Sequence, residues 1–79
     1  MMPIMNINQA IKMLRIRKGF SQEKLAELAN LDRSFISMME NGQRNPGLQT
    51  LDKLAEFLGF RTWEILKAID EGKCEVLFK

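Results

Sequence analysis

The chain has 79 residues, 46% of them hydrophobic and 28% charged, with a formal net charge of +2, one cysteine and no histidine. This length supplies a single domain and excludes a separate catalytic domain. Cys74 alone cannot form an internal disulfide, and without histidine the chain lacks the residues for a zinc site or a histidine-dependent catalytic triad. The sequence therefore predicts no metal and no cofactor. No apolar run is long enough for a membrane span, so we also expect a cytoplasmic protein.

Charge is unevenly distributed along the chain. Residues 1–44 carry seven basic and four acidic side chains, a net charge of +3, whereas residues 45–79 carry five basic and six acidic ones, a net charge of −1. An excess of positive charge in one half of the chain is a feature of small proteins that bind polyanions. Taken alone, however, so small an excess is better explained by an ordinary solvated surface.

Helix-forming residues dominate the sequence, and strand formers are scarce, with one valine, two threonines and no tyrosine. The sequence therefore predicts an all-α domain. A first helix is predicted over about Asn8–Lys18, because Ile7, Ile11 and Leu14 recur at helical spacing. Gly19 is placed to end this helix, since glycine adopts the left-handed conformation of a C-terminal cap without strain.

The next two predicted helices are separated by a very short turn. Ser21 is placed to cap a helix over Gln22–Ala29, and Asp32 is placed to cap another over Arg33–Glu40. Between them Asn30 tolerates the left-handed conformation that ends a helix. Helices joined by so short a turn must cross steeply, because the chain cannot run back antiparallel. The buried side of the first of the two is predicted to be Leu25, Leu28 and Ala29.

The helix over Arg33–Glu40 has two different sides. Its inner side is predicted to carry Ile36, Met39 and part of Phe35, and Asn41-Gly42 is placed to end it. Its other side is left free to contact a partner. The residues on that free side are Arg33, Ser34, Ser37 and Met38.

Two further helices complete the prediction. The fourth carries a regular apolar stripe and ends at Gly59. That stripe consists of Leu48, Leu51, Leu54, Ala55 and Leu58. The fifth, over about Thr62–Asp70, is apolar on more than one face, with Trp63 and Leu66 among its large side chains. This excess of apolar surface needs a second surface to cover it.

Three stretches at fixed spacing carry a family resemblance. They read Ser21-Gln-Glu-Lys-Leu-Ala-Glu-Leu-Ala29, Leu31-Asp-Arg-Ser-Phe-Ile-Ser37 and Glu40-Asn-Gly-Gln-Arg-Asn-Pro46. Over roughly residues 7–68 the chain resembles the helix-turn-helix family of the lambdoid phage repressors and Cro, the XRE family. Within it, the second stretch looks most like the controller proteins of restriction-modification systems. The resemblance implies a compact five-helix, lambda repressor-like domain that binds double-stranded DNA and regulates transcription.

The chain departs from the family pattern at two positions. Asn30 stands where the turn usually has glycine, and since asparagine tolerates a positive φ better than other non-glycine residues, we expect the turn geometry to be kept. Controller proteins often carry tyrosine where Phe35 stands. Without a hydroxyl group, Phe35 can stack or pack but cannot donate a hydrogen bond to a phosphate or a base.

The helix over Arg33–Glu40 is predicted to read bases, because the major groove admits one α-helix and shows a distinct pattern of donors and acceptors for each base pair. Arg33 taken alone is better explained as a surface arginine that pairs with Glu27 or Asp32, but its place at the exposed start of a capped helix after a short turn favours a bidentate contact to guanine. The residues predicted at base edges are Arg33, Ser34, Ser37 and Met38. The residues predicted at phosphates are Asn41, Gln43, Arg44 and Asn45.

The resemblance adds two further roles. Gln22 matches a family glutamine that binds phosphate together with the helix N-terminus, although it can also simply favour helix initiation. Arg15 and Glu40 match a family pair that ties the first helix to the third. This pair is therefore expected to be structural.

A homodimer on a pseudo-palindromic operator is predicted, because one module of this size makes few contacts and specific affinity usually requires two copies. The apolar residues left over near the carboxyl end, where relatives dimerise, are Phe57, Phe60, Trp63, Leu66 and Ile69. The domain core is expected over residues 7–70, followed by a short tail over 71–79. That tail could pair across the dimer as a strand or cap the core, with Cys74 as a small buried hydrophobe.

Three classes of function follow from these residues. The leading hypothesis is a dimeric transcription regulator that can control its own operon, with RNA polymerase as a further candidate partner. The second is an antitoxin of the same fold, which would show a second apolar surface or a toxin-binding tail. The third is a small nuclease, but the sequence predicts no enzyme, because Asp70-Glu71 is the only adjacent acidic pair and more simply ends a helix.

Overall fold

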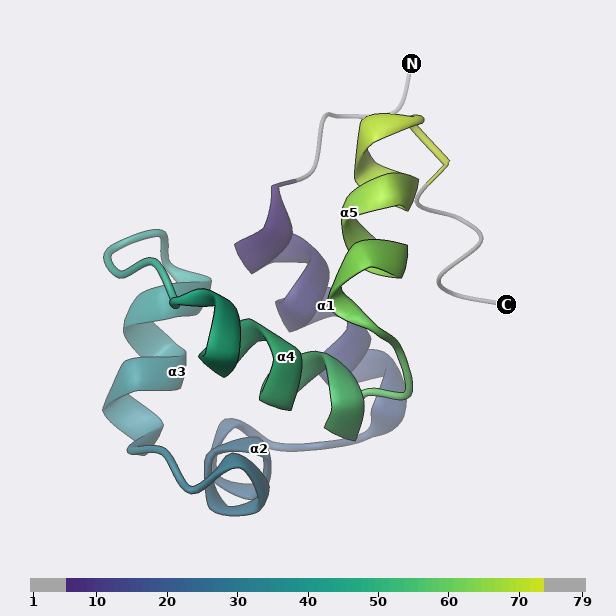
Figure 1. Ribbon diagram of the computed structural model, residues 1–79. Coiled ribbons are helices and arrows are strands. Elements are labelled where there is room, and N and C mark those ends of the chain that lie inside the picture. Colours follow the sequence, from purple (N-terminus) through teal and green to yellow (C-terminus); the bar gives the residue numbers. More distant parts are fainter. Residues whose placement is uncertain (1–5, 74–79) are drawn as a thin grey trace.

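The computed structural model describes residues 6–73, which fold into five α-helices without a strand in that range (Figure 1). The helices are α1 (Ile7–Lys18), α2 (Gln22–Ala29), α3 (Arg33–Glu40), α4 (Leu48–Phe57) and α5 (Thr62–Asp70). The predicted all-α architecture is therefore confirmed. Cys74 and the rest of the predicted tail beyond residue 73 lie outside the described residues. Within residues 6–73, no helix combines the length and the apolar character needed to cross a bilayer.

Helix α1 begins one residue earlier than predicted because of a capping box. The Asn6 side chain accepts a hydrogen bond from the Gln9 backbone N–H at 2.9 Å, and the Gln9 side chain accepts one from the Asn6 N–H at 3.0 Å. These reciprocal bonds satisfy donors that a helix N-terminus leaves free. At the other end of α1, Gly19 adopts the left-handed conformation with φ 83°.

The turn between α2 and α3 has the conformation predicted for it, with one difference. Asn30 has φ 56°, and the Ser21 hydroxyl accepts a hydrogen bond from Lys24 N–H at 3.0 Å. Asp32 occupies the N-cap position of α3, but its side chain makes no capping hydrogen bond. The N–H of Phe35, which such a cap could use, donates instead to the Asp32 main-chain oxygen at 3.0 Å. The prediction of a side-chain cap at Asp32 was therefore wrong.

The short turn makes α2 and α3 cross steeply. Figure 1 shows α2 almost end-on, whereas α3 lies across its axis. The turn is held closed by the Leu31 N–H, which donates to the Ala26 carbonyl at 2.8 Å. Helices α3 and α5 lie at opposite ends of the molecule, with α1 and α4 between them (Figure 1).

The core is formed by all five helices. Its buried apolar side chains are Ala10, Ile11, Leu14, Leu25, Ala26, Ala29, Ile36, Met39, Leu54, Ala55, Leu58, Ile65 and Ala68. Leu28, predicted to be buried, is only half-buried, and the small Ala26 packs on the core in its place. Leu48 is 67% exposed, so the predicted apolar stripe of α4 was wrong at its first position. Leu48 is the first residue of α4 and projects beyond the part of the helix that packs on the core.

Candidate nucleic-acid interface

The outer side of α3 is open at the N-terminal end of the helix and partly covered further along. Arg33 and Ser34 are exposed, and Ser37 and Met38 are half-buried. On the opposite side of the same helix, Ile36 and Met39 have no exposed surface. Helix α3 is therefore anchored by its inner face and presents a polar outer face with one apolar side chain, that of Met38.

Arg33 is free to contact a partner. Neither Asp32 nor Glu27 forms an ion pair with its guanidinium, and no other carboxylate in residues 6–73 does so. Glu27 lies 3.9 Å from the Lys24 ammonium instead, in an exposed pair within α2. The surface ion pair that was the alternative role of Arg33 is therefore not formed among the described residues.

The segment between α3 and α4, residues 41–47, extends the outer face of α3; we call it the α3–α4 loop. The side chains predicted to reach phosphates, Asn41, Gln43, Arg44 and Asn45, are all exposed. The loop leaves α3 through Gly42, which has φ 77°, and the Gln43 N–H donates to the Met38 carbonyl at 2.8 Å. This bond satisfies a terminal carbonyl of α3 and fixes the start of the loop against the helix.

Two side chains from outside the α3–α4 loop contact it. The Arg44 guanidinium carbon lies 5.5 Å from the centre of the Phe35 ring, within the range of a cation–π contact. On the other side, the Asn8 amide nitrogen of α1 donates to Asn45 Oδ1 at 3.4 Å. Sequence analysis did not single out Asn8, because an asparagine near the start of a helix ordinarily indicates only a capping residue.

A buried polar network ties α1, α2 and α3 together behind the outer face of α3. The Arg15 guanidinium donates to both Glu40 carboxylate oxygens, at 2.6 and 3.0 Å, and to the Phe20 carbonyl at 2.8 Å. The Gln22 amide nitrogen donates to Glu40 as well, at 3.0 Å. Arg15 and Glu40 are both buried, so the carboxylate is fully paired inside the protein.

Gln22 therefore has a different immediate partner from the phosphate that the resemblance implied. Its side-chain nitrogen is committed to Glu40, whereas its side-chain oxygen forms no hydrogen bond with any described residue. The backbone N–H groups at the start of α2 belong to the terminal donors that a helix leaves without internal partners. The N-terminus of α2 thus retains the capacity to bind an anion even though the Gln22 amide is partly engaged.

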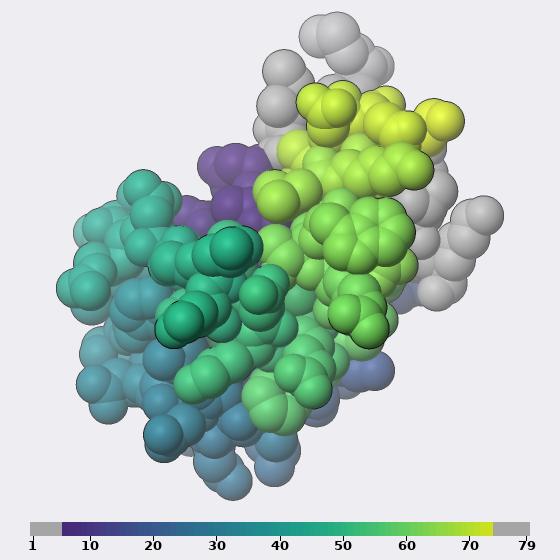
Figure 2. Space-filling view, viewed as in Figure 1, coloured from purple at the N-terminus to yellow at the C-terminus, as the bar shows by residue number. Residues whose placement is uncertain are grey.

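Helices α4 and α5 lie side by side on one face of the molecule (Figure 2), and the surface that they share differs from the outer face of α3. Trp63 is 61% exposed and Leu66 45% exposed, whereas the other predicted interface residues are half-buried against the core; these are Phe57, Phe60 and Ile69. An open hollow beside Trp63 is lined in part by Asp52, Glu56 and Glu64. This face therefore combines large exposed apolar groups with an acidic rim.

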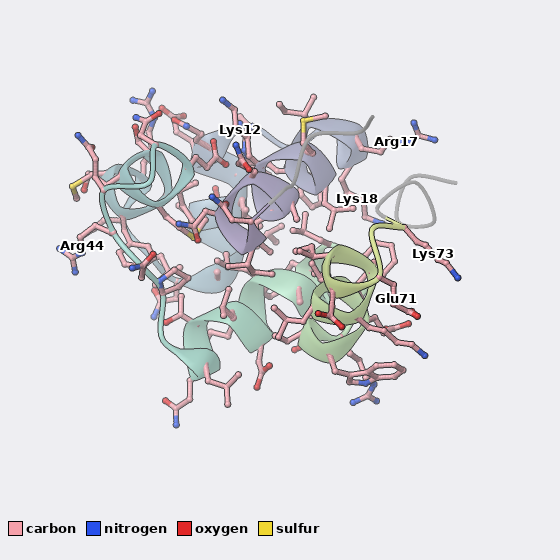
Figure 3. The ribbon with its side chains drawn as sticks, turned by 90° about the horizontal axis from the view of Figure 1, so that it is seen from above. Lys12, Arg17, Lys18, Arg44, Glu71 and Lys73 are labelled. Atoms are coloured by element: carbon pink, nitrogen blue, oxygen red, sulfur yellow. The ribbon has the colours of Figure 1, made fainter. Side chains whose placement is uncertain are left out.

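The exposed cations do not all lie beside α3. Figure 3 shows Arg44 pointing away from the body at one end of the molecule, whereas Arg17 and Lys73 point outward at the opposite end. Lys12 projects from α1 between these two ends (Figure 3). The positive charge of the first half of the chain is therefore only partly gathered at the outer face of α3.

No group of three or more His, Cys, Asp or Glu side chains in the range 6–73 is arranged to hold a metal ion. Hydrogen-bond donors at the outer face of α3 and in the α3–α4 loop would meet acceptors, and cations would meet anions.

Comparisons with known proteins agree with this geometry. A family model described as Helix-turn-helix matches residues 11–66. Control protein C.BamHI of Bacillus amyloliquefaciens is 37% identical over 68 residues, which is 85% of this chain and 84% of that protein. The uncharacterized HTH-type transcriptional regulator YqaF of Bacillus subtilis (strain 168) is 42% identical over 55 residues, 70% of this chain and 71% of that protein.

Solved structures give the same result. The restriction-modification controller protein C.AhdI from Aeromonas hydrophila superimposes with a TM-score of 0.69 at 45% identity, covering 73% of this chain and 88% of that one. The controller protein C.Esp1396I, solved as a tetramer in complex with its natural 35 base-pair operator, gives a TM-score of 0.71 at 31% identity, covering 81% and 84%. The chain therefore belongs to the XRE-type helix-turn-helix family, with restriction-modification controller proteins among its relatives.

Proposed function

We propose that this protein is a sequence-specific DNA-binding transcription regulator that acts as a homodimer on a pseudo-palindromic operator. The observation that carries this proposal is the outer face of α3, where Arg33 and Ser34 are exposed while Ile36 and Met39 on the inner face are completely buried. A rigid helix with one free polar side fits the major groove, where base pairs are distinguishable. The relatives named above support the proposal, since one of them was solved on its operator.

Base recognition is assigned to four side chains of α3. Arg33, without a carboxylate partner among the described residues, would bind guanine O6 and N7, a contact worth about 1–3 kcal/mol of discrimination. Ser34 is exposed and would reach a base edge or a phosphate. Ser37 and Met38 are half-buried, so they would contact only those base-edge groups that come close to the surface of α3. The Met38 side chain suits contact with a thymine methyl group.

Phosphate binding is assigned to the edges of the same face. The N-terminus of α2 would bind one phosphate through its free backbone N–H groups, with the Gln22 side-chain oxygen turned away from Glu40. Gln22 is uncharged, and its hydrogen bond to Glu40 would hold the start of α2 in place beside that phosphate. The α3–α4 loop would bind the neighbouring backbone through Asn41, Gln43, Arg44 and Asn45.

Dimerisation is assigned to the face shared by α4 and α5. Exposed Trp63 and Leu66 are the large apolar groups that a second copy would cover. They lie on the helix at the opposite end of the molecule from α3 (Figure 1). A two-fold axis near α5 would therefore leave both copies of α3 free to contact one duplex.

The test is to select binding sites from a randomised duplex pool and to measure affinity for the selected site by gel shift. Arg33→Ala is expected to relax the preference at one base pair by about 1–3 kcal/mol. Arg44→Ala is expected to weaken all duplexes alike and to lower the slope of log K against log salt by about 0.9. Arg17→Ala removes an arginine at the opposite end of the molecule and serves as the matched control (Figure 3).

Two results would contradict the proposal. One is a failure to enrich any sequence from the pool while the protein remains folded. The other is equal loss of preference in the Arg33→Ala and Arg17→Ala variants, because the first lies on α3 and the second at the far end of the molecule. With a selected site in hand, transcription in vitro with purified RNA polymerase then distinguishes activation from repression.

A further inference from the structure

We infer that the α3–α4 loop is held ready for the DNA backbone by two positioning residues, Phe35 and Asn8, which act through Arg44 and Asn45 and do not themselves need to contact DNA. This inference rests on the proposed function. It assigns a role to Phe35 that requires no hydroxyl group, and it assigns a role to Asn8, whose sequence position indicates nothing about DNA.

Phe35 provides a platform for Arg44. Its ring is half-buried and packs on the core, so it is fixed in place by the body of the protein. Arg44 is exposed on the loop, and its guanidinium carbon lies 5.5 Å from the ring centre. An exposed arginine normally loses considerable rotamer freedom when it binds a phosphate. The ring restricts that freedom before binding, while the guanidinium edge remains free to donate hydrogen bonds to a phosphate.

Asn8 holds the next residue of the loop from the other side. It lies on α1, is only 7% exposed, and donates across 37 positions of sequence to Asn45 Oδ1 at 3.4 Å. It makes the only side-chain hydrogen bond between α1 and the loop within residues 6–73. Consecutive loop residues, Arg44 and Asn45, are thus held by two different elements of the body.

The local chemistry of Asn8 separates this role from a contribution to folding. Asn8 Oδ1 is buried without a hydrogen-bond partner among the described residues. A buried polar atom without a partner destabilises the folded state. Asparagine is also a weaker helix former than alanine. The unpartnered oxygen of Asn8 thus offsets part of what its hydrogen bond to Asn45 contributes to the stability of the fold.

Phe35 is tested by a double-mutant cycle with Arg44, using the selected duplex as the probe. Phe35→Leu is expected to weaken binding about two- to fivefold in the wild-type protein, the value of an exposed cation–π contact. In the Arg44→Ala background the same change is expected to have no effect. Phe35→Tyr keeps the ring and is expected to retain the coupling to Arg44. If the Phe35→Leu effect came from misfolding, it would not depend on Arg44.

Asn8 is tested by a second cycle, with Asn45. Asn8→Ala is expected to weaken DNA binding about twofold, which is at the lower end of the contribution of a single hydrogen bond because this bond is long. In the Asn45→Ala background the same change is expected to have no effect. The same variant is expected to keep or raise the urea midpoint of unfolding, since it removes the unpartnered oxygen. If Asn8 only stabilised the fold, Asn8→Ala would lower the urea midpoint and leave the DNA affinity of the folded protein unchanged.

The outcomes separate this inference from the proposed function. If Phe35→Leu or Asn8→Ala weakens binding equally in both backgrounds, that residue contacts DNA directly and its positioning role is overturned. If Arg44→Ala and Asn45→Ala leave the affinity and the salt slope unchanged, the loop does not bind the backbone, and the inference fails while the proposed function stands. If the wild-type protein selects no duplex, the proposed function itself fails.

Discussion

The α2–α3 half and the α4–α5 half of this small domain are stabilised in different ways. Behind α2 and α3 lies a buried polar network in which Glu40 accepts hydrogen bonds from Arg15 and Gln22, and the outer surface of α3 is polar. Helices α4 and α5 are held mainly by aliphatic packing around Leu54 and Ile65, with one hydrogen bond between them from the Thr62 hydroxyl to Asp52 Oδ1 at 2.6 Å, and they carry exposed apolar groups on their surface. The surface proposed to read DNA and the surface proposed to join two copies thus differ in their distribution of polar groups.

The comparison explains why the polar network lies where it does. Helix α3 has only eight residues, and its outer side must stay free to enter a groove, so it can be anchored on one side only. An ion pair with several hydrogen bonds fixes the direction of a helix more strictly than apolar contacts, which tolerate sliding. The α4–α5 face needs no such orientation within one subunit, because a partner would complete it.

The largest effect is expected from Glu40→Ala. It would leave the Arg15 guanidinium buried without its carboxylate and would remove the acceptor of Gln22. Loss of one member of a buried pair costs about 3–5 kcal/mol, which a domain of this size barely tolerates. Urea unfolding followed by circular dichroism measures the change.

A double replacement sharpens that result. Arg15→Met combined with Glu40→Leu removes both charges and is expected to restore most of the lost stability, because matched apolar groups can replace a buried ion pair. The same protein is expected to bind DNA poorly, since the direction of α3 is then set by apolar contacts alone. Full DNA affinity in the double variant would show that the network does not orient α3.

The second prediction compares two leucines of α4. Leu54 has no exposed surface, and Leu54→Ala is expected to cost about 2–5 kcal/mol through the lost contacts and the cavity. Leu48 is 67% exposed, and Leu48→Ala is expected to change the unfolding free energy by less than about 0.5 kcal/mol. Urea midpoints of the two variants give the difference directly. Equal losses would mean that Leu48 packs on a surface in solution.

These leucines show how far the sequence predicts the fold. The helical spacing of Leu51, Leu54 and Leu58 predicts one stripe that also includes Leu48, and for the last two of the three the structure confirms full burial. Spacing along a helix defines an angular face, but it does not tell how far the neighbouring helices extend along that face. Burial at the first turn of α4 depends on tertiary packing, which the local pattern does not contain.

The candidate site shows the same limit. The outer residues of α3 follow from its helical period, and in the structure Arg33 and Ser34 are exposed whereas Ser37 and Met38 are half-buried. The hydrogen bond between Gln22 and Glu40 and the contact between Asn8 and Asn45 join residues far apart in sequence. No local pattern predicts such pairs, because they depend on the angle between helices. The pairing of Arg15 with Glu40 came from the family resemblance, not from residue spacing.

The third prediction concerns the face shared by α4 and α5. Trp63→Glu places a charge at an exposed aromatic position beside the acidic hollow and is expected to weaken a dimer formed there at least tenfold, about 1.4 kcal/mol. The urea midpoint of the monomer should change little, because the Trp63 side chain is outside the core. Sedimentation equilibrium measures the dimer constant, with Leu48→Glu as an equally exposed control. An unchanged constant would place the dimer interface on another face.

The smallest effect is expected at the turn that joins α2 to α3. Asn30 has φ 56°, which glycine adopts without strain, asparagine at a modest cost and alanine at a larger one. Glycine also gains more freedom in the unfolded chain, so Asn30→Gly is expected to raise the unfolding free energy by only about 0.5 kcal/mol and Asn30→Ala to lower it by about 1 kcal/mol. Urea midpoints of the two variants measure both changes. The DNA affinity of the folded proteins should stay constant, because the crossing of α2 and α3 is set by the length of the turn and by the buried network, and not by the Asn30 side chain. A loss of affinity in both variants at unchanged stability would instead show that the Asn30 side chain takes part in binding.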